Sequence, residues 1–405
     1  MKKSLLTLAV LGAFAGVAQA QSTVTLYGVA DAWVGSDRSQ TLGIKQAATA
    51  TTPAVLGLVG ERQIRQNSGG RNGSRWGLRG VEDLGGGLKG NFVLESGFTI
   101  DDGNVANGAT MFGRQAYVGV SGGFGEIRLG RQYTAYDELR AGNNTVGDTA
   151  FSPTGDVWGQ GAAPSVLTGD VLRASLIAAG LTTAQANAAV AQAAAEAALL
   201  PADYSNRVNN QIYYATPNIS GLTASIGFAL GENKVPGASA TNVLSAKVQY
   251  AAGPFMIGFA HQNQKVRTTA GVLNSFAGVA PPLNPNAAAN SPSTKFNLIS
   301  GSFNFGVAKL IAAYQQVDRT DGIDDKEFKV GLDVPLGSAL VARLGYAQAK
   351  GYDDTVKSKG FGGILDYSLS KRTNAYFGLR MTESKAEGVK FSKNEVVAVG
   401  LRHAF

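Results

Sequence analysis

The last ten residues of the chain, 396–405, alternate strictly between two faces. Val397, Val399, Leu401, His403 and Phe405 share one side of the predicted strand, and the residues between them share the other. A strand edge left without a partner promotes aggregation, so this strand needs a neighbour. In lipid, every strand is paired only in a closed barrel, where the last strand meets the first. The pattern therefore predicts an all-β transmembrane barrel that Val399, Leu401 and Phe405 help to close.

The N-terminus predicts export. Lys2 and Lys3 precede an apolar run at 5–17, and residues 18–20 form a small-x-small cleavage site before Gln21. We expect residues 1–20 to be a cleaved signal peptide and residues 21–405 to form a single barrel domain. Beyond this run no segment is long and apolar enough for a transmembrane helix. Since the chain has no cysteine, a disulfide-stapled domain and any cysteine-based metal or redox site are excluded.

The connections between the predicted strands fall into two length classes. Tight turns are expected at 83–87, 122–125, 217–221, 252–254, 335–338 and 370–372. Long polar loops are expected at 35–72, 100–110, 134–206 and 267–293. About sixteen strands result, with short turns on the periplasmic side and long loops on the extracellular side, as in outer-membrane barrels.

Two segments add detail to this prediction. On the second strand, Arg75 and Arg79 alternate with Trp76 and Leu78, which indicates a wet lumen behind an apolar outer wall. Residues 165–200 are rich in alanine and predict a helical insertion within the long third loop, 134–206.

The sequence resembles the general-diffusion porins of Gram-negative outer membranes over the whole mature chain. Four stretches carry the resemblance, in the family's order: 24–28, 74–89, 130–133, and 397–400 with the terminal Phe405. The resemblance implies a sixteen-stranded barrel that forms a homotrimer. It also implies that the third loop folds inward and narrows each pore.

In that family, basic side chains on the wall face acidic groups on the inward loop. The resemblance assigns the basic wall to Arg75, Arg131, Arg207 and Arg114. Alternation also turns Arg75 and Arg207 into the lumen, whereas Arg131 and Arg114 have the parity of outward residues. A bulge at Gly130 would be needed to turn Arg131 inward.

The acidic partners expected on the third loop are Asp137, Glu138, Asp148 and Asp156. Opposed charges across a narrow throat sort solutes by charge, and rings of arginine favour anions. The insertion at 165–200 departs from the family's compact loop, so the sequence leaves open which of these carboxylates reach the throat.

The function implied by the resemblance is passive diffusion of small hydrophilic solutes and ions through the outer membrane, with a mild anion preference. Implied partners are outer-membrane lipid, lipopolysaccharide and the barrel assembly machinery, which would recognise the C-terminal strand. Two other functions stay open: a substrate-specific channel, and an adhesin or structural barrel with a plugged lumen.

Motifs for other chemistry are weak. Residues 85–90 are rich in glycine but lack the order of a phosphate-binding loop. His261 with Ser245 is a remote candidate for a hydrolase pair. The aspartates at 318, 321, 324 and 325 lack EF-hand spacing. We therefore expect no enzyme activity, no cofactor, no metal site and no nucleic-acid partner.

Overall fold

The computed structural model describes residues 23–46, 55–108, 110–147, 149–159, 183, 184, 187, 204–234, 240–265, 293–319, 324–351, 354, 356–386 and 388–405. The predicted signal peptide, the predicted site residue Asp148 and most of the alanine-rich insertion lie outside them. Of that insertion, Thr183, Ala184 and Asn187 are described and are helical. Within the described part of the chain, no helix has the length and apolar character that crossing a membrane requires.

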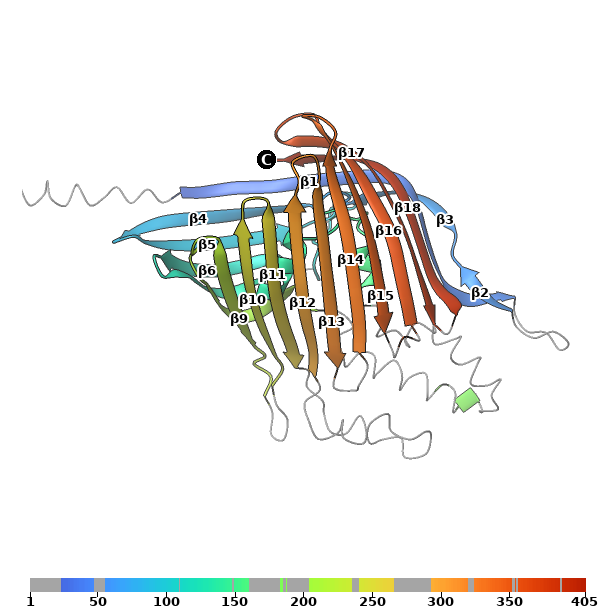
Figure 1. Cartoon of the computed structure of the whole chain (residues 1–405), viewed down its shortest axis with the longest axis horizontal. Coiled ribbons are helices and arrows are strands. Elements are labelled where there is room, and N and C mark those ends of the chain that lie inside the picture. Colours follow the sequence, from blue (N-terminus) through green and yellow to red (C-terminus); the bar gives the residue numbers. More distant parts are fainter. Residues whose placement is uncertain are drawn as a thin grey trace, which may run out of the picture.

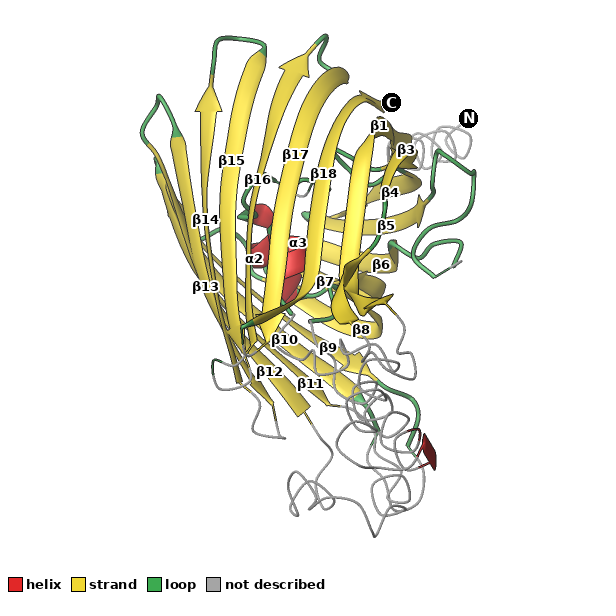
Figure 2. Ribbon diagram, turned by 90° about the vertical axis from the view of Figure 1, so that its right-hand side faces the viewer, coloured by secondary structure: helices red, strands yellow, loops and turns green. Residues whose placement is uncertain are grey.

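Nearly all of the described chain is strand (Figure 1). The strands are β1 (Thr23–Gln46), β2 (Val55–Val59), β3 (Arg62–Ser68), β4 (Arg75–Gly85), β5 (Leu88–Gly97), β6 (Gln115–Gly122), β7 (Gly125–Tyr133), β8 (Arg207–Ala215), β9 (Leu222–Leu230), β10 (Asn242–Ala252), β11 (Phe255–Lys265), β12 (Ser293–Asn304), β13 (Lys309–Arg319), β14 (Asp324–Pro335), β15 (Leu340–Gly351), β16 (Val356–Ser368), β17 (Thr373–Ala386) and β18 (Val389–Ala404). Two short helices of the third loop, α2 (Ala135–Gly142) and α3 (Thr154–Val157), lie within the curve of the sheet (Figure 2).

The sheet closes on itself as an antiparallel barrel. β18 pairs with β1 from Val29↔Ala404 to Thr41↔Ser392. The backbone N–H of Gly28 donates to the carbonyl of Phe405 over 3.0 Å, and the N–H of Phe405 donates back over 3.1 Å. β2, β3 and β4 all pair with β1, so they share one position in the ring. The eighteen described strands therefore occupy sixteen positions, which confirms the predicted fold.

The first long connection is shorter than expected. We predicted a polar loop over 35–72, but β1 continues to Gln46 and β3 pairs with it from Ala32↔Ser68 to Arg38↔Arg62. A strand needs only about 9–11 residues to cross a bilayer, and β1 has 24. Because backbone pairing does not require apolar side chains, a polar segment extends the sheet beyond the membrane.

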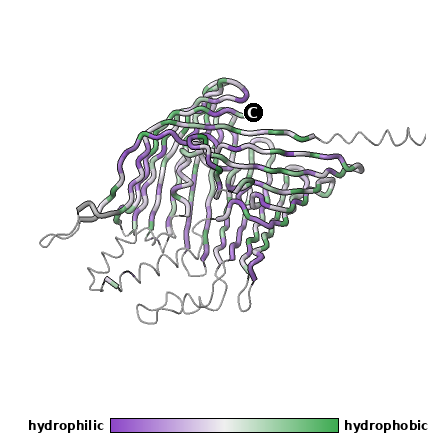
Figure 3. Tube along the Cα trace, turned by 180° about the vertical axis from the view of Figure 1, so that it is seen from behind, coloured by the Kyte–Doolittle hydropathy of each residue, from purple (hydrophilic) through white to green (hydrophobic). Residues whose placement is uncertain are grey.

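The two faces of the sheet differ as predicted. Val399 and Leu401 are each 52% exposed on the outer face, whereas Val396 and Ala398 are buried on the inner face. Hydrophilic and hydrophobic residues alternate along most strands (Figure 3). The apolar wall on the outside meets the demand of lipid, and the inside is left for polar groups.

Candidate functional site

The third loop enters the barrel directly after β7. Thr134 caps α2, since its Oγ1 accepts a hydrogen bond from the backbone N–H of Asp137 over 3.2 Å. Asp137 and Glu138 occupy the first turn of the helix, where their charges complement the helix dipole. The sequence thus starts a helix where the wall strand ends.

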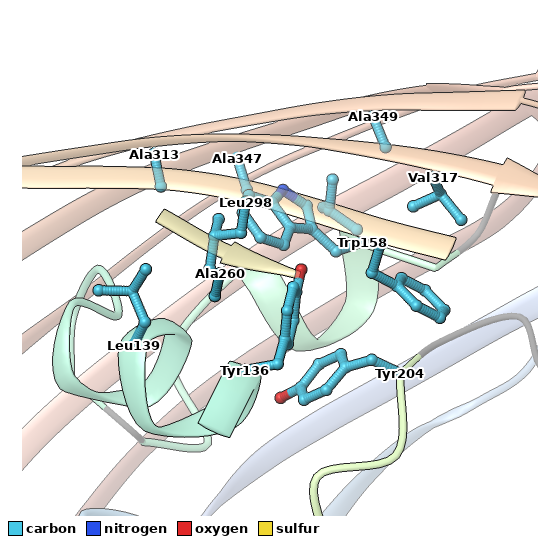
Figure 4. Packing of buried hydrophobic residues seen from close by; sticks show 12 residues of the cluster. Tyr136, Leu139, Trp158, Tyr204, Ala260, Leu298, Ala313, Val317, Ala347 and Ala349 are labelled. Carbon is cyan, nitrogen blue, oxygen red and sulfur yellow. The ribbon is translucent and has the colours of Figure 1, made fainter. Parts of the chain in front are cut away.

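Tyr136 and Leu139 of α2 join Val157 and Trp158 of the same loop in a buried cluster with inner-wall residues of β11, β12, β13 and β15 (Figure 4). Tyr136 and Leu139 are almost fully buried there, among small, aliphatic and aromatic wall residues. Burying each such side chain contributes roughly 1.5–3 kcal/mol. The wall residues of this cluster are Ala260, Phe296, Leu298, Ala313, Val317, Ala347 and Ala349.

Polar groups of β13 and β14 tie the loop to the same wall. Glu327 accepts a hydrogen bond from the backbone N–H of Gly159 over 2.6 Å and another from the side-chain amide of Gln315. Gln315 in turn accepts from the hydroxyl of Tyr136. The Lys329 ammonium donates to the Asn144 side chain over 3.3 Å and lies 4.7 Å from the Trp158 ring centroid. These buried groups hold both ends of the described loop segment.

Glycines on the inner wall make room for the middle of the loop. Gly331, Gly345 and Gly362 stand opposite one another on β14, β15 and β16. A Cβ at Gly362 would lie 1.9 Å from the carbonyl oxygen of Phe151, and one at Gly345 would lie 2.7 Å from the Val146 side chain. Only glycine permits so close an approach of the loop backbone.

Of the predicted acidic residues, Glu138 and Asp156 meet basic groups of the wall. Glu138 lies 2.6 Å from the Lys247 ammonium and 3.9 Å from the Arg128 guanidinium. Asp156 lies 3.1 Å from the Arg380 guanidinium. Asp137 is buried and accepts a hydrogen bond from the Tyr204 hydroxyl over 2.7 Å.

The predicted basic residues have different neighbours from those expected. Arg75 and Arg114 both approach Glu95 of β5, at 3.7 Å and 2.7 Å. The Tyr27 hydroxyl donates to the same carboxylate over 3.0 Å. Their acidic partner is therefore a wall residue that the sequence analysis did not name.

Arg131 and Arg207 lie beside a β-bulge. Two residues of β8, at 209 and 210, stand opposite Arg131 alone, and Asn210 has a φ of 53°. Arg131 nevertheless pairs with Ala116, which shares the face of the outward Val118, so the bulge belongs to β8 and does not turn Arg131 inward.

The bulge also removes the argument for Arg207. The alternation that turns Tyr213 inward breaks at 209–210 and does not extend to Arg207. The Arg207 guanidinium instead packs over the Tyr133 ring, 4.2 Å from its centroid. The register therefore argues against Arg131 at the constriction, and the presence of Arg207 there stays a prediction.

A second group of arginines, which the sequence analysis missed, gathers near the start of β4. Arg71 and Arg343 converge on Asp366, at 2.7 Å and 3.0 Å. Arg402 donates to the side chain of Asn72 over 2.7 Å and has no carboxylate within 4.0 Å in the described residues. Arg402 was recognisable by its parity with Ala398 and Gly400. Arg71, in the connection before β4, had no such signal.

Asp31 holds Arg71 in place. Its carboxylate accepts backbone N–H groups of Gly70, Arg71 and Asn72 at 2.9, 3.0 and 2.8 Å. It also accepts the Tyr376 hydroxyl over 2.6 Å. Since its charge is satisfied by backbone dipoles, Asp31 fixes the turn at 70–72 rather than pairing with an arginine.

The described part of the site therefore combines an inward loop with a charged inner wall. The third loop is fixed against one side of the inner barrel wall. On the opposite side, arginines outnumber the carboxylates that contact them. Within the described ranges, no three His, Cys, Asp or Glu side chains group as metal ligands would.

Comparison with known proteins agrees with this arrangement. The family model described as "Gram-negative porin" matches residues 7–387. The chain is 32% identical to outer membrane porin protein 32 of Delftia acidovorans and 28% identical to an outer membrane porin of Bordetella pertussis, with all of each chain covered.

Among solved structures, the anion-selective porin from Comamonas acidovorans matches with a TM-score of 0.66 and 27% identity, covering 95% of this chain and 100% of that one. The sixteen-position barrel, the match to the family model and the full-length relatives agree with one another. The chain therefore belongs to the Gram-negative porin family and is a protein of the cell outer membrane.

Proposed function

We propose that this porin is a water-filled channel for passive diffusion of small hydrophilic solutes and ions, with a mild preference for anions. A polar lumen spares a charged solute the large cost of entering hydrocarbon. The relative from Comamonas acidovorans is described as anion-selective, which supports the same preference here.

The observation that carries the charge preference is the sharing of carboxylates among arginines. Arg71 and Arg343 converge on Asp366, and Arg75 and Arg114 converge on Glu95. Asp333 is a further acidic neighbour of Arg343, at 3.5 Å. On the inner face of β4, Arg79 packs over the Tyr27 ring at 5.1 Å.

Two further arginines have no direct ion-pair partner among the described residues. In the described part of the chain, neither Arg79 nor Arg402 has a carboxylate within 4.0 Å. The lumen around them therefore carries excess positive charge, which concentrates anions in a narrow passage with low-dielectric walls.

Reversal potentials in planar bilayers under a salt gradient test this proposal. We expect the wild-type channel to favour chloride over potassium, and the double variant R79Q/R402Q to lower the permeability ratio by about twofold. The control R372Q removes an exposed arginine from a turn outside the lumen and should leave the ratio unchanged. A cation preference of the wild type would contradict the charge assignment, and zero conductance would favour a plugged adhesin.

The proposal includes three sets of partners. A homotrimer is supported by the resemblance to the trimeric porin family, and the pairing of β18 with β1 fits recognition of the C-terminal strand by the barrel assembly machinery. Contact with outer-membrane lipid and lipopolysaccharide follows from the apolar outer wall.

A further inference from the structure

An apolar groove opens on the outer face of the barrel where β16, β17, β18 and β1 lie side by side. Strand register places Tyr367 opposite Ala375, Ala375 opposite Leu401, and Leu401 opposite Ala32. These four residues line the groove together with outward residues of adjacent positions. Its volume is about 570 Å³, within the roughly 300–1,000 Å³ of most ligand sites.

The groove results from the small side chains of Ala375 and Ala32. The next outward row on the same four strands is bulky throughout, and its members are 39–52% exposed: Leu365, Phe377, Val399 and Val34. An alanine has no atoms beyond Cβ to fill the space between such neighbours. A hollow left unfilled forfeits the dispersion contacts of its walls, so hydrocarbon of matching shape is favoured in it.

The groove faces the hydrocarbon of the membrane. Nearly all of its lining residues are apolar or aromatic, and Gln66 of β3 is the exception. Because the protein belongs to the outer membrane and the outer face of its strands is apolar, lipid chains lie against this wall. The groove therefore plays no part in the charge arrangement proposed for the pore.

Polar groups follow at the turn end of the groove. One outward position beyond Ala375 and Leu401, Thr373 stands opposite His403, and Thr373 Oγ1 lies 2.9 Å from His403 Nδ1. Both residues continue the outward alternation of β17 and β18. The imidazole therefore stands directly beyond the apolar lining.

The turn between β16 and β17 adds two positive charges at the same end. Lys371 and Arg372 are both exposed, and the Arg372 carbonyl accepts a hydrogen bond from the Ala404 N–H over 2.8 Å. In the described residues no carboxylate, the chain terminus included, lies within 4.0 Å of either. Asp366, the acidic residue of β16, is held on the inner face by two arginines. Lys371, Arg372 and His403 thus form a basic rim.

The rim lies at the level of the headgroups of the periplasmic leaflet. The short turns and the C-terminus share one end of the barrel (Figure 1), and in outer-membrane barrels that end faces the periplasm. Tyr367, 48% exposed near the end of β16, marks the interface, where tyrosines are enriched. Since rim and groove adjoin on the same strands, the fitting partner combines an anionic headgroup with an acyl chain.

We propose that the groove and the basic rim bind an anionic phospholipid of the periplasmic leaflet. One acyl chain lies in the groove beside Ala375 and Ala32, and the phosphate accepts charge-assisted hydrogen bonds from the rim. A soluble anion would contact the rim alone, whereas the lipid occupies rim and groove together. The inference rests on the proposed contact of the outer wall with lipid, and it is independent of the charge preference of the pore.

Photoreactive phosphatidylglycerol, with a diazirine in one acyl chain, tests the inference. The folded full-length protein is placed in phosphatidylcholine vesicles that contain a small fraction of this probe. After irradiation, mass spectrometry of the digested protein identifies the labelled residues. The same probe with a choline headgroup measures the contribution of the negative charge.

The rim variant is K371Q/R372Q, and its control is K265Q/K295Q, which removes two exposed lysines at the other end of the barrel. We expect phosphatidylglycerol to label the groove of the wild type more than its choline counterpart does. The rim variant should lower that labelling by about tenfold. The control should change it less than about twofold.

The groove variant is A375F, which fills the hollow without changing the charge. Its control is A312F, at an outward alanine of β13 away from the groove. We expect A375F to lower labelling of the groove severalfold with either headgroup, because the acyl chain loses its place. A312F should leave it unchanged. Heat-modifiable gel mobility confirms folding of each variant.

Equal labelling of the groove in wild type and rim variant would overturn the inference, as would labels spread evenly over the outer wall. A groove without label on an otherwise labelled wall would assign it to another occupant, such as a second copy of the chain, and would also overturn it. An outer wall without any label would contradict the proposed contact with lipid itself. An unchanged reversal potential in the rim variant separates each result from the proposed pore function.

Discussion

The lumen has a covered wall on β11–β17 and an open wall on β18, β1, β4 and β5. On the covered wall many of the inward residues are small or apolar, such as Ala313, Ala347 and Gly362, because the third loop lies on them. On the open wall they are charged, such as Arg75, Glu95 and Arg402. One wall therefore positions the loop, and the other provides charge to the passage, although the backbone geometry of both is the same.

The largest effect is expected from adding one methyl group to the covered wall. In G362A the new Cβ meets the backbone carbonyl of Phe151, which cannot rotate away, so the loop must shift. We expect a loss of stability near the upper end of roughly 1–3 kcal/mol and a changed single-channel conductance.

The matched control is G363A, one residue along the same strand and on the outer face. Its new Cβ comes no nearer than 3.1 Å to the flexible Leu344 side chain. The two variants should differ in denaturant midpoint and in conductance. Equal behaviour would show that the loop does not rest on the glycines.

A smaller effect is expected from K329M. Methionine fills a similar space, but it leaves the side chain of Asn144 and the carbonyl of Arg140 without the donor that Lys329 provides. We expect the attachment of the loop to weaken by about 1–2 kcal/mol, seen as more frequent closing events in single-channel records. The control K295M changes an exposed lysine and should leave the closing frequency unaltered. Closing events that stay at the wild-type rate in K329M would argue against the anchor.

The smallest effect is expected from E138Q, at a loop carboxylate that faces β7 and β10, the strands between the two walls. The substitution removes the charge that faces Lys247 and Arg128, so two basic groups lose part of their compensation. Anion preference should rise, by less than about twofold in the permeability ratio. Reversal potentials measure the change, with E82Q, an exposed residue near the end of β4, as the control. A fall in anion preference would mean that Glu138 does not face the permeating ions.

Features with a local cause were predictable from the sequence. The outward set of Val397, Val399 and Leu401 follows from a period of two, and most of the tight turns follow from their glycines and prolines. Features with a remote cause were not predictable. The bulge in β8 defeated the alternation at Arg207, because a single extra residue reverses the parity beyond it. Arg71 and Arg343 stand 272 positions apart in the chain and meet at Asp366 only after the ring has closed.

The length of the polar part of β1 could not be predicted from the sequence either. Residues 36–46 read as loop because they are polar, yet β1 retains backbone partners there. Hydropathy indicates which side chains are apolar enough to face lipid. It does not indicate how far the backbone pairing of a sheet continues beyond the membrane.

The seam between β1 and β18 has a consequence for the order of folding. Every other neighbouring pair of described strands joins segments that are much nearer in sequence, whereas Val29 must find Ala404. Bringing such distant segments together carries the greatest loss of chain entropy of any pairing in the molecule. Until that last pairing is made, β1 and β18 each present a free hydrogen-bonding edge, so the nascent sheet needs protection at two places at once.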